Sequence, residues 1–386
     1  MVRRSMTHFR SVQRRRPGFP ARARWFAPAA VLLALVAVLV SPRLSAAAPA
    51  SEKVDPCNIS GATRVVGIGD VHGAFEALTS ILQAAGLVDN QLRWSGGQAH
   101  LVQMGDLVDR GPEARKVIDL LMRLEGEAEA AGGRVHALLG NHEVAVMLGD
   151  WRSSSPEEFE EFRTTDSEGV RERVLEASLE DARRQAGDRG EKFDAARFRE
   201  AFLAKTPLGW LERRVAFGPN GKYGKWMRQL PAVARVNGVL FVHGGISPEV
   251  ASLGCPAINA RVHADLTKDI DRTLAKPLES LVARADGPLW YRGLAQMPDP
   301  SFRPAVEAIL SRMEARAIVS GHSVVAGGRI TSRFGSRVYL IDTGMLSAVY
   351  QGGRPSAIEF TEKGVTAIYL DGRAQPVDRD ASLNGG

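Results

Sequence analysis

The chain has 386 residues, 44% of them hydrophobic and 24% charged, so it can bury a large core and is not a disordered protein. Its formal net charge is +6, but nine of its fifty Lys and Arg residues lie in the first fifty positions, where Asp and Glu are absent. The remainder has 41 basic and 44 acidic side chains, a formal charge of −3. The basic balance therefore belongs to the N-terminus, and we expect no nucleic-acid partner.

The first fifty residues predict a secretory signal. Arginines precede an apolar run at 25–40, and small residues follow at 46–50, so we expect cleavage after Ala50. The alternative is an uncleaved anchor that attaches the protein to a membrane through residues 25–40. That run contains Pro28 and is shorter than the ~20 residues of a comfortable transmembrane helix. Both alternatives place the rest of the chain in the periplasm or outside the cell.

Strand-like and helix-like segments alternate in the next part of the chain. Helices are indicated by apolar residues at helical spacing, and strands by short runs of β-branched and aliphatic residues. The predicted elements are a strand at Thr63–Ile68, a helix at Phe75–Ala85, a strand at His100–Met104, a helix at Pro112–Leu124 and a strand at Val135–Leu139. This alternation favours βαβ units in a layered α/β core.

The segment from about 150 to 230 is predicted to be a helical insert. Ser155 and Pro156, followed by two acids, are typical of a helix start. Apolar residues recur at helical spacing up to Gly187, and a second helix is expected at Phe193–Leu203. The insert is either a solvated elaboration of the fold or a cap over the sheet edge that shapes substrate access.

Strands resume after the insert. They are predicted at Gly238–Val242, Ala317–Ser320, Arg337–Ile341, Ala357–Phe360 and Val365–Tyr369, the last two forming a hairpin around residues 362–364. One domain is expected over 51–375, with a flexible tail at 376–386. The two cysteines, Cys57 and Cys255, form either a disulfide, as is common in an oxidising compartment, or two buried thiols.

Five short blocks rich in Asp, His and Asn each follow a strand-like run. They are Gly-Asp-Val-His-Gly at 69–73, Gly-Asp-Leu-Val-Asp-Arg-Gly at 105–111, Gly-Asn-His-Glu at 140–143, His-Gly-Gly at 243–245 and Gly-His at 321–322. Loops at the carboxyl edge of an α/β sheet converge on one crevice, so we expect these blocks to meet there. A single block means little, but all five in this order indicate one site.

The polar residues of these blocks suit two divalent metal ions. Asp70 and His72 are two positions apart on an extended loop, so their side chains point the same way, and Asp106 is the natural bridging carboxylate. The remaining candidate ligands are Asn141, His243 and His322. The absence of a thiolate from this set favours Mn, Fe or Zn over copper or an iron–sulfur cluster. A hydroxide held between two such ions is a strong nucleophile towards phosphorus.

Further residues of the motifs suit phosphate binding and proton transfer. Arg110 can contact two phosphate oxygens, and Arg292 is a second candidate, with a structural salt bridge as its alternative. His142 can donate a proton to a leaving group while Asp109 orients it. Asp342, at a strand end, either supports the metal ligands or forms a turn.

Three other histidines carry weaker signals. His100 and His136 lie within strand runs, so we expect core or surface residues rather than ligands. His263 has no supporting motif around it.

The five blocks, with Phe-Val-His-Gly-Gly-Ile-Ser at 241–247 and Pro-Leu-Trp-Tyr-Arg-Gly at 288–293, resemble the calcineurin-like metallophosphoesterase superfamily. Within it they look like the phosphoprotein phosphatase branch and most like the Shewanella-like phosphatases, over roughly residues 62–345. The resemblance implies a central β-sandwich flanked by helices. It also implies two metals, the first held by Asp70, His72 and Asp106, and the second by Asp106, Asn141, His243 and His322. Arg110 and Arg292 would bind phosphate, and His142 with Asp109 would serve the leaving group.

Two departures from the better-known Ser/Thr enzymes concern specificity. The last histidine lies in Gly-His-Ser rather than Ala-His-Gln, and the insert before His243 is long. Shewanella-like members include tyrosine-directed phosphatases. The sequence thus predicts an exported two-metal enzyme that hydrolyses phosphomonoesters, of phosphorylated proteins (Tyr or Ser/Thr) or of small molecules. The alternatives are a diadenosine-polyphosphate hydrolase and a non-catalytic binding protein on a phosphatase fold.

Overall fold

The structure is a computed structural model that describes residues 55–371 and 375–378. The predicted signal at 1–50 lies outside these residues. Among the helices of the described part, none has the length and apolar character needed to cross a bilayer.

Two mixed β-sheets form the centre of the fold. The first, in spatial order, contains β11 (Gln375–Asp378), β10 (Gly364–Tyr369), β9 (Ser356–Thr361), β1 (Val65–Ile68), β2 (His100–Gln103) and β3 (Arg134–Ala137). The second contains β4 (Val233–Val236), β5 (Val239–Val242), β6 (Ala317–Ser320), β8 (Val338–Leu340) and β7 (Thr331–Arg333). Strands β1, β2 and β3 run parallel to one another, as do β5, β6 and β8.

Alternating side chains build the core from both faces of each sheet. In β5, Phe241 packs with Val102 of β2 and Phe360 of β9 in a cluster shared by the two sheets, while its neighbour Leu240 belongs to the cluster that includes the helices. Successive strand residues point to opposite faces, so strands covered on both faces are apolar throughout. The two sheets therefore pack face to face as a sandwich.

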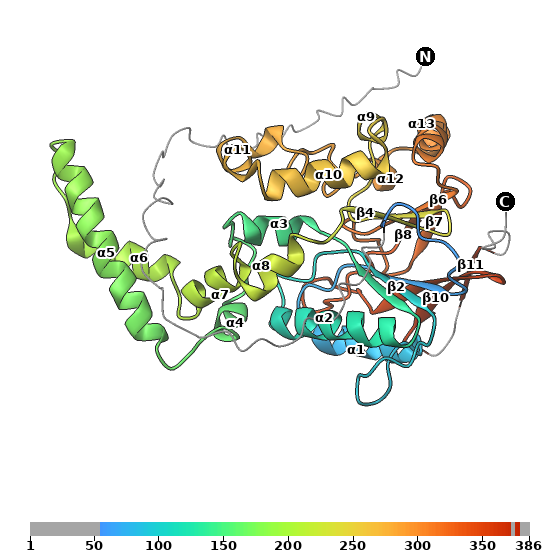
Figure 1. Cartoon of the computed structure of the whole chain (residues 1–386), viewed down its shortest axis with the longest axis horizontal. Coiled ribbons are helices and arrows are strands. Elements are labelled where there is room, and N and C mark those ends of the chain that lie inside the picture. Colours follow the sequence, from blue (N-terminus) through green and yellow to red (C-terminus); the bar gives the residue numbers. More distant parts are fainter. Residues whose placement is uncertain (1–54, 372–374, 379–386) are drawn as a thin grey trace, which may run out of the picture. The chain divides into compact units, whose positions relative to one another are not determined.

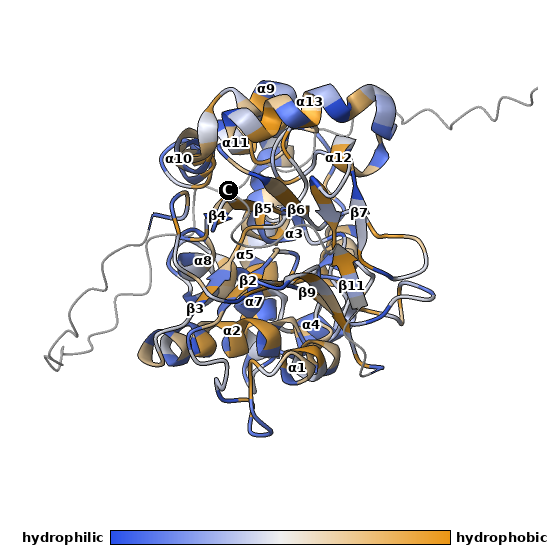
Figure 2. Cartoon of the chain, turned by 90° about the vertical axis from the view of Figure 1, so that its right-hand side faces the viewer, coloured by the Kyte–Doolittle hydropathy of each residue, from blue (hydrophilic) through white to orange (hydrophobic). Residues whose placement is uncertain are grey.

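Helices cover the outer faces of the sandwich (Figures 1 and 2). On one side lie α1 (Phe75–Ala84) and α2 (Ala114–Ala130), and on the other α9 (Pro248–Ala251), α10 (Gly254–Leu266), α11 (Ile270–Ala275), α12 (Gly293–Gln296) and α13 (Asp299–Arg312). The short helix α3 (Asn141–Met147) follows β3, and a 3-10 turn occupies Pro277–Glu279. This arrangement is the helix-flanked β-sandwich that the family resemblance implies.

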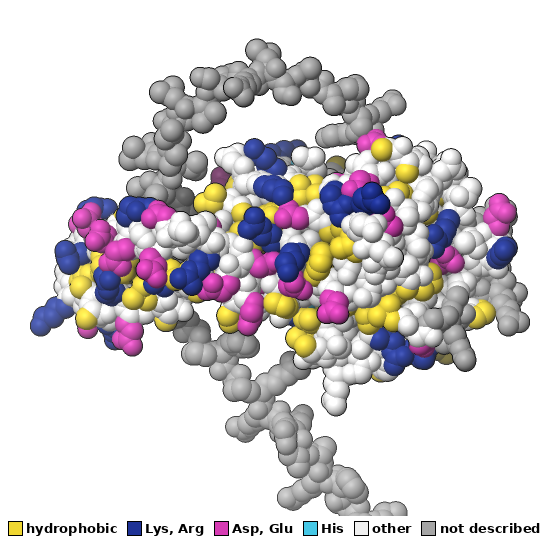
Figure 3. Space-filling view, turned by 90° about the horizontal axis from the view of Figure 1, so that it is seen from below, with side chains coloured by type: hydrophobic (Ala, Val, Ile, Leu, Met, Phe, Trp, Pro, Cys, Tyr) yellow, Lys and Arg dark blue, Asp and Glu magenta, His cyan; other side chains and the backbone are white. Residues whose placement is uncertain are grey.

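The insert consists of α4 (Pro156–Glu160), α5 (Ser167–Asp188), α6 (Ala195–Lys205), α7 (Trp210–Phe217) and α8 (Lys222–Met227). Helices α5 and α6 extend away from the sheets as an arm (Figure 1). Acidic and basic side chains are mixed over the surface of this arm (Figure 3). Arg199 of α6 pairs with Glu172 of α5. The segments that flank this arm in the sequence, at residues 151–158 and at Arg213, instead pack close to the Asp109 loop.

The predicted hairpin is confirmed, since β9 and β10 pair antiparallel across residues 362–363. Helix α2 continues six residues past the predicted end at Leu124. Strands β4, β7 and β11 and the helices after β5 have no counterpart among the predicted elements. Strand β11 pairs with β10 and includes the first residues of the segment expected to be a flexible tail.

The two cysteines form a disulfide, the first of the two alternatives left open by the sequence. Cys57 bonds to Cys255 and thereby joins the segment before β1 to α10. The same segment is held against β4, because the backbone N–H of Arg235 donates to the carbonyl of Pro56. The start of the domain is thus fixed to the second sheet.

Candidate active site

The six candidate ligands lie at the carboxyl ends of strands from both sheets. Asp70 and His72 follow β1, Asp106 follows β2 and Asn141 begins α3 after β3. From the other sheet, His243 follows β5 and His322 follows β6. None of the six is more than 7% exposed. The topology thus brings together residues up to 252 positions apart, as the motif pattern predicts.

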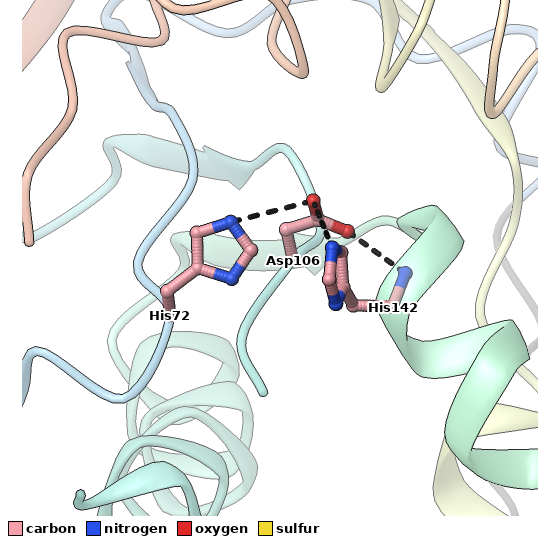
Figure 4. Close-up of side chains that lie close together, drawn as sticks. All are labelled: His72, Asp106 and His142. Carbon is pink, nitrogen blue, oxygen red and sulfur yellow. Dashed lines mark hydrogen bonds and ion pairs between the residues drawn. The ribbon is translucent and has the colours of Figure 1, made fainter. Parts of the chain in front are cut away.

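Asp106 lies between the imidazole rings of His72 and His142 (Figure 4). Its Oδ2 is 3.6 Å from Nε2 of His72 and 3.9 Å from Nε2 of His142. One ligand atom from each of the three residues lies within 4.8 Å of the others. These three residues therefore form one group with the donor atoms and spacing of a metal site.

A second such group contains Asp106 again, now with His243 and His322. Oδ1 of Asp106 is 3.3 Å from Nε2 of His243, and Oδ1 of Asn141 is 2.9 Å from the same nitrogen. Asp106 thus belongs to both groups through its two carboxylate oxygens. This is the arrangement expected of a carboxylate that bridges two ions.

Asp70 lies beside both groups. Its Oδ2 is 4.0 Å from Nε2 of His72, and its Oδ1 is 4.0 Å from Nδ1 of His243. The backbone N–H of His322 donates to this carboxylate at 3.0 Å. The sequence assigned Asp70 as the third ligand beside His72 and Asp106, and His142 to proton donation. In the structure, the third member of the first group is His142, and Asp70 lies beside it.

Hydrogen bonds prepare the histidines to act as ligands. The Nδ1–H groups of His72 and His243 can donate to the carbonyls of Val108 and Met104, both at 2.9 Å, which leaves each Nε2 lone pair facing the site. Nε2 of His322 is buried and has no hydrogen-bond partner among the described residues. Burial lowers the pKa of His72 to about 4 and that of His322 to about 3, so both are neutral ligands at pH 7.

The charges of the site also suit cations. Burial and the carboxylates of Asp342 and Asp106 raise the pKa of Asp70 well above its ordinary value. Burial also opposes ionisation of Asp106, but His243 and His142 hold its pKa well below the usual range. Crowded buried carboxylates are stabilised by positive charge. The donor set and its electrostatics therefore fit two divalent ions.

Strained backbone marks the loops that carry these residues. In the described part of the chain, five of the ten non-glycine residues with positive φ are His72 (+47°), Asp106 (+53°), Asp109 (+67°), Arg110 (+72°) and His322 (+63°). Such conformations cost about 1–3 kcal/mol each and persist only where the surroundings enforce them.

Two glycines let the backbone approach the carboxylates of the site closely. A Cβ on Gly140 would lie 2.2 Å from Asp106 Oδ1, and one on Gly321 would lie 2.5 Å from Asp70 Oδ1.

Arg110 and Arg292 lie beside different metal groups. Arg110 Nη1 contacts Nε2 of His72, and its Nη2 is 2.8 Å from Nε2 of His142. Arg292 Nη1 donates to the backbone carbonyl of His322 at 2.8 Å and to Ser323 Oγ at 3.1 Å. Among the described residues, Arg292 forms no ion pair with a carboxylate, so the salt-bridge alternative is not what the structure shows.

His142 and Asp109 form the predicted pair. Nδ1 of His142 is 2.7 Å from Oδ2 of Asp109, and Asp109 is fully buried. Burial and the guanidinium of Arg110 lower the pKa of His142, but the carboxylates of Asp106 and Asp109 outweigh these effects and raise it above its ordinary value. The pair therefore favours the protonated imidazole, which is the form that a general acid requires.

Two residues near the site, Tyr350 and Glu143, were given no role from the sequence alone. Tyr350 accepts a hydrogen bond from Arg110, and it lies in a loop without any motif. Glu143 is in a motif, and its carboxylate accepts backbone N–H groups of Gly140, Asp106 and Leu107, each at 2.8 Å. Glu143 therefore fixes the loop that carries Asp106.

The structure also shows the surroundings of Asp342, His100 and His136. Asp342 combines its two alternatives, because it accepts the N–H of Gly344 in a turn and also raises the pKa of Asp70. His100 and His136 contact each other at 3.1 Å from neighbouring strands.

Residues 63–326 match the model of the calcineurin-like phosphoesterase family. The chain is 30% identical to Shewanella-like protein phosphatase 2 of Arabidopsis thaliana, with 79% of this chain and 77% of the relative covered. It is 26% identical to Shewanella-like protein phosphatase 1 of Plasmodium berghei, with 81% and 76% covered. The fold is similar to that of a cold-active protein-tyrosine phosphatase of a psychrophilic Shewanella species (TM-score 0.62, 23% identity, 88% and 89% covered).

Proposed function

This chain belongs to the calcineurin-like phosphoesterase family and is a metal-dependent phosphoesterase, and we propose that it removes phosphate from phosphorylated proteins. The observation that carries the proposal is the position of Asp106, whose two oxygens face two separate groups of histidines. A site with two metal ions suits an in-line displacement at phosphorus. The names of the relatives support a phosphoprotein as the substrate.

We propose that one ion is held by Asp70, His72 and Asp106, and the other by Asp106, Asn141, His243 and His322. The oxygen and nitrogen donors favour Mn, Fe or Zn. When bound, two such ions supply positive charge beside the phosphate and lower the pKa of a water molecule that can attack it.

The side chains then perform the remaining tasks. Arg110 and Arg292 hold phosphate oxygens from the two sides of the site, which limits the orientations of the bound phosphate. The imidazole of His142 donates a proton from Nε2 to the departing oxygen of the substrate. Asp109 keeps the other ring nitrogen protonated and orients the ring.

The purified chain should release inorganic phosphate from phosphotyrosine or phosphoserine peptides, but should not cleave diadenosine tetraphosphate at a comparable kcat/KM. Measurement of phosphate and nucleotide products with the three substrates, after addition of manganese, checks this expectation. Cleavage of the dinucleotide alone would assign the chain to the nucleotide hydrolases. Bound metal without turnover of any phosphoester would instead support a non-catalytic binding protein.

We also propose that the enzyme is exported and acts in the periplasm or outside the cell. The support is the Arg-rich N-terminus with its apolar run at 25–40, together with the disulfide between Cys57 and Cys255. N-terminal sequencing of the protein from its host should therefore begin near Ser51 in an exported fraction. A membrane-bound chain that begins at Met1 would assign residues 25–40 to an anchor, whereas a soluble cytoplasmic chain that begins at Met1 would contradict export.

A further inference from the structure

The first residues of the helical insert surround the backbone of Asp109 and Arg110. The N–H of Arg110 donates to the carbonyl of Ser153 at 3.0 Å, and the N–H of Asp109 donates to Glu158 Oε1 at 2.9 Å. Ser154 Oγ donates to Asp109 Oδ1 at 2.6 Å. Because both Asp109 and Arg110 have positive φ, their conformation depends on such external bonds.

Arg213, on α7 near the other end of the insert, completes this network. Its Nη2 lies 3.0 Å from Glu158 Oε1 and 3.6 Å from Asp109 Oδ1, and its Nη1 donates to Ser154 Oγ at 3.0 Å. The side chains of Arg213, Asp109 and Glu158 are fully buried. The guanidinium also packs against the rings of Trp151, Phe159 and Phe217.

The network ends at the candidate proton donor. Asp109 uses Oδ2 to hold Nδ1 of His142 and Oδ1 to accept from Ser154, with Arg213 facing the same oxygen. One guanidinium thus faces two buried acidic side chains, Asp109 and Glu158. Without that charge, Asp109 would lose the cation beside its Oδ1 in a buried site, and with it its fixed orientation.

We propose that Arg213 and Glu158 are positioning residues through which the helical insert holds the Asp109–His142 pair in the geometry for proton donation. This inference rests on the proposed function, because it takes His142 as the proton donor. The insert then influences the departure of the leaving group from a place that touches neither substrate nor metal.

The test is the double variant Arg213→Met/Glu158→Gln, which removes the charged groups of these two residues. The Gln keeps an acceptor for the Asp109 N–H, and the Met places an apolar chain among the three rings. We expect kcat on phenyl phosphate, whose leaving group needs a proton, to fall at least about tenfold more than kcat on 4-nitrophenyl phosphate. Bound metal should remain at the wild-type amount. A purely structural role would lower both rates together.

The matched control is Arg228→Met. Arg228 is another buried arginine of the insert region, but its guanidinium donates to the carbonyls of Phe217 and Gly224 and pairs with no carboxylate among the described residues. We expect the ratio of the two rates to stay at the wild-type value. Should the double variant fail to fold, Ser154→Ala removes the bond to Asp109 and the acceptor of Arg213 Nη1, but keeps the three charged residues. It should shift the ratio in the same direction by a smaller factor.

The outcomes separate the two claims. A wild-type chain that hydrolyses neither phosphate ester would refute the proposed function. An active wild type whose double variant or Ser154→Ala variant keeps the wild-type ratio would overturn the positioning role. Equal loss on both substrates together with loss of metal would also overturn it, by assigning the network to the integrity of the metal site.

Discussion

Asp106→Asn should lose activity by roughly 10³-fold or more, the scale on which charge-stabilising groups contribute to phosphoryl transfer. The amide keeps the size of the side chain but removes the negative charge that faces both groups of histidines. Because one residue serves both groups, bound metal should fall at both positions. Elemental analysis of the purified variant, together with phosphate release, measures the two effects.

Asp265→Asn is the matched control for this variant. Asp265 is equally buried, but it accepts the backbone N–H of Leu281 at 2.7 Å and pairs with Arg261 away from the metal groups. We expect its substitution to lower thermal stability without lowering metal content. An Asp106→Asn protein that keeps two ions per chain and full activity would refute the shared site.

His142→Asn should slow hydrolysis according to how strongly the leaving group needs a proton. A serine alkoxide is a poor leaving group, so kcat on a phosphoserine peptide should fall ~10²–10⁴-fold. 4-Nitrophenolate departs without help, so the fall in kcat on 4-nitrophenyl phosphate should be at least about tenfold smaller. Bound metal should be nearly unchanged. Comparison of kcat on a phosphoserine peptide and on 4-nitrophenyl phosphate, with elemental analysis, checks all three expectations.

This variant also decides between two roles for His142. The side chain is paired with Asp109, as a proton donor requires, but its Nε2 is also 3.9 Å from Asp106 Oδ2 in one of the two metal groups. Loss of metal with equal loss on both substrates would make His142 a ligand. His263→Asn, at a histidine bonded to the carbonyl of Arg228, is the control and should change neither activity nor metal content.

The candidate ligands could be predicted because each lies in a short polar block that follows a strand-like run. Strands of both sheets place these blocks at one edge. The supporting residues could not be predicted in the same way. Glu158 was predicted as part of a helix start, and it does cap α4, but its bond to the N–H of Asp109 depends on tertiary packing. Arg213 and Tyr350 lie 104 and 240 positions from the residues that they support and carry no motif.

Two of the strands absent from the prediction, β7 and β11, depend on their partners more than on their own residues. Strand β7 has only three residues, all polar, and its strand geometry comes from antiparallel pairing with β8. Strand β11 contains Pro376 and pairs with β10 across a shift in register. Short polar segments of this kind have little β-propensity of their own, so hydrophobic alternation does not reveal them.

The central claim, that two divalent ions share Asp106 in one phosphate-cleaving site, is tested most directly by reconstitution. The chain is stripped with a chelator and titrated with manganese while bound ions and phosphate release are followed in the same samples. We predict that activity rises to its full value only as the second ion binds to each chain. Full activity with one ion per chain, or with none, would contradict the claim.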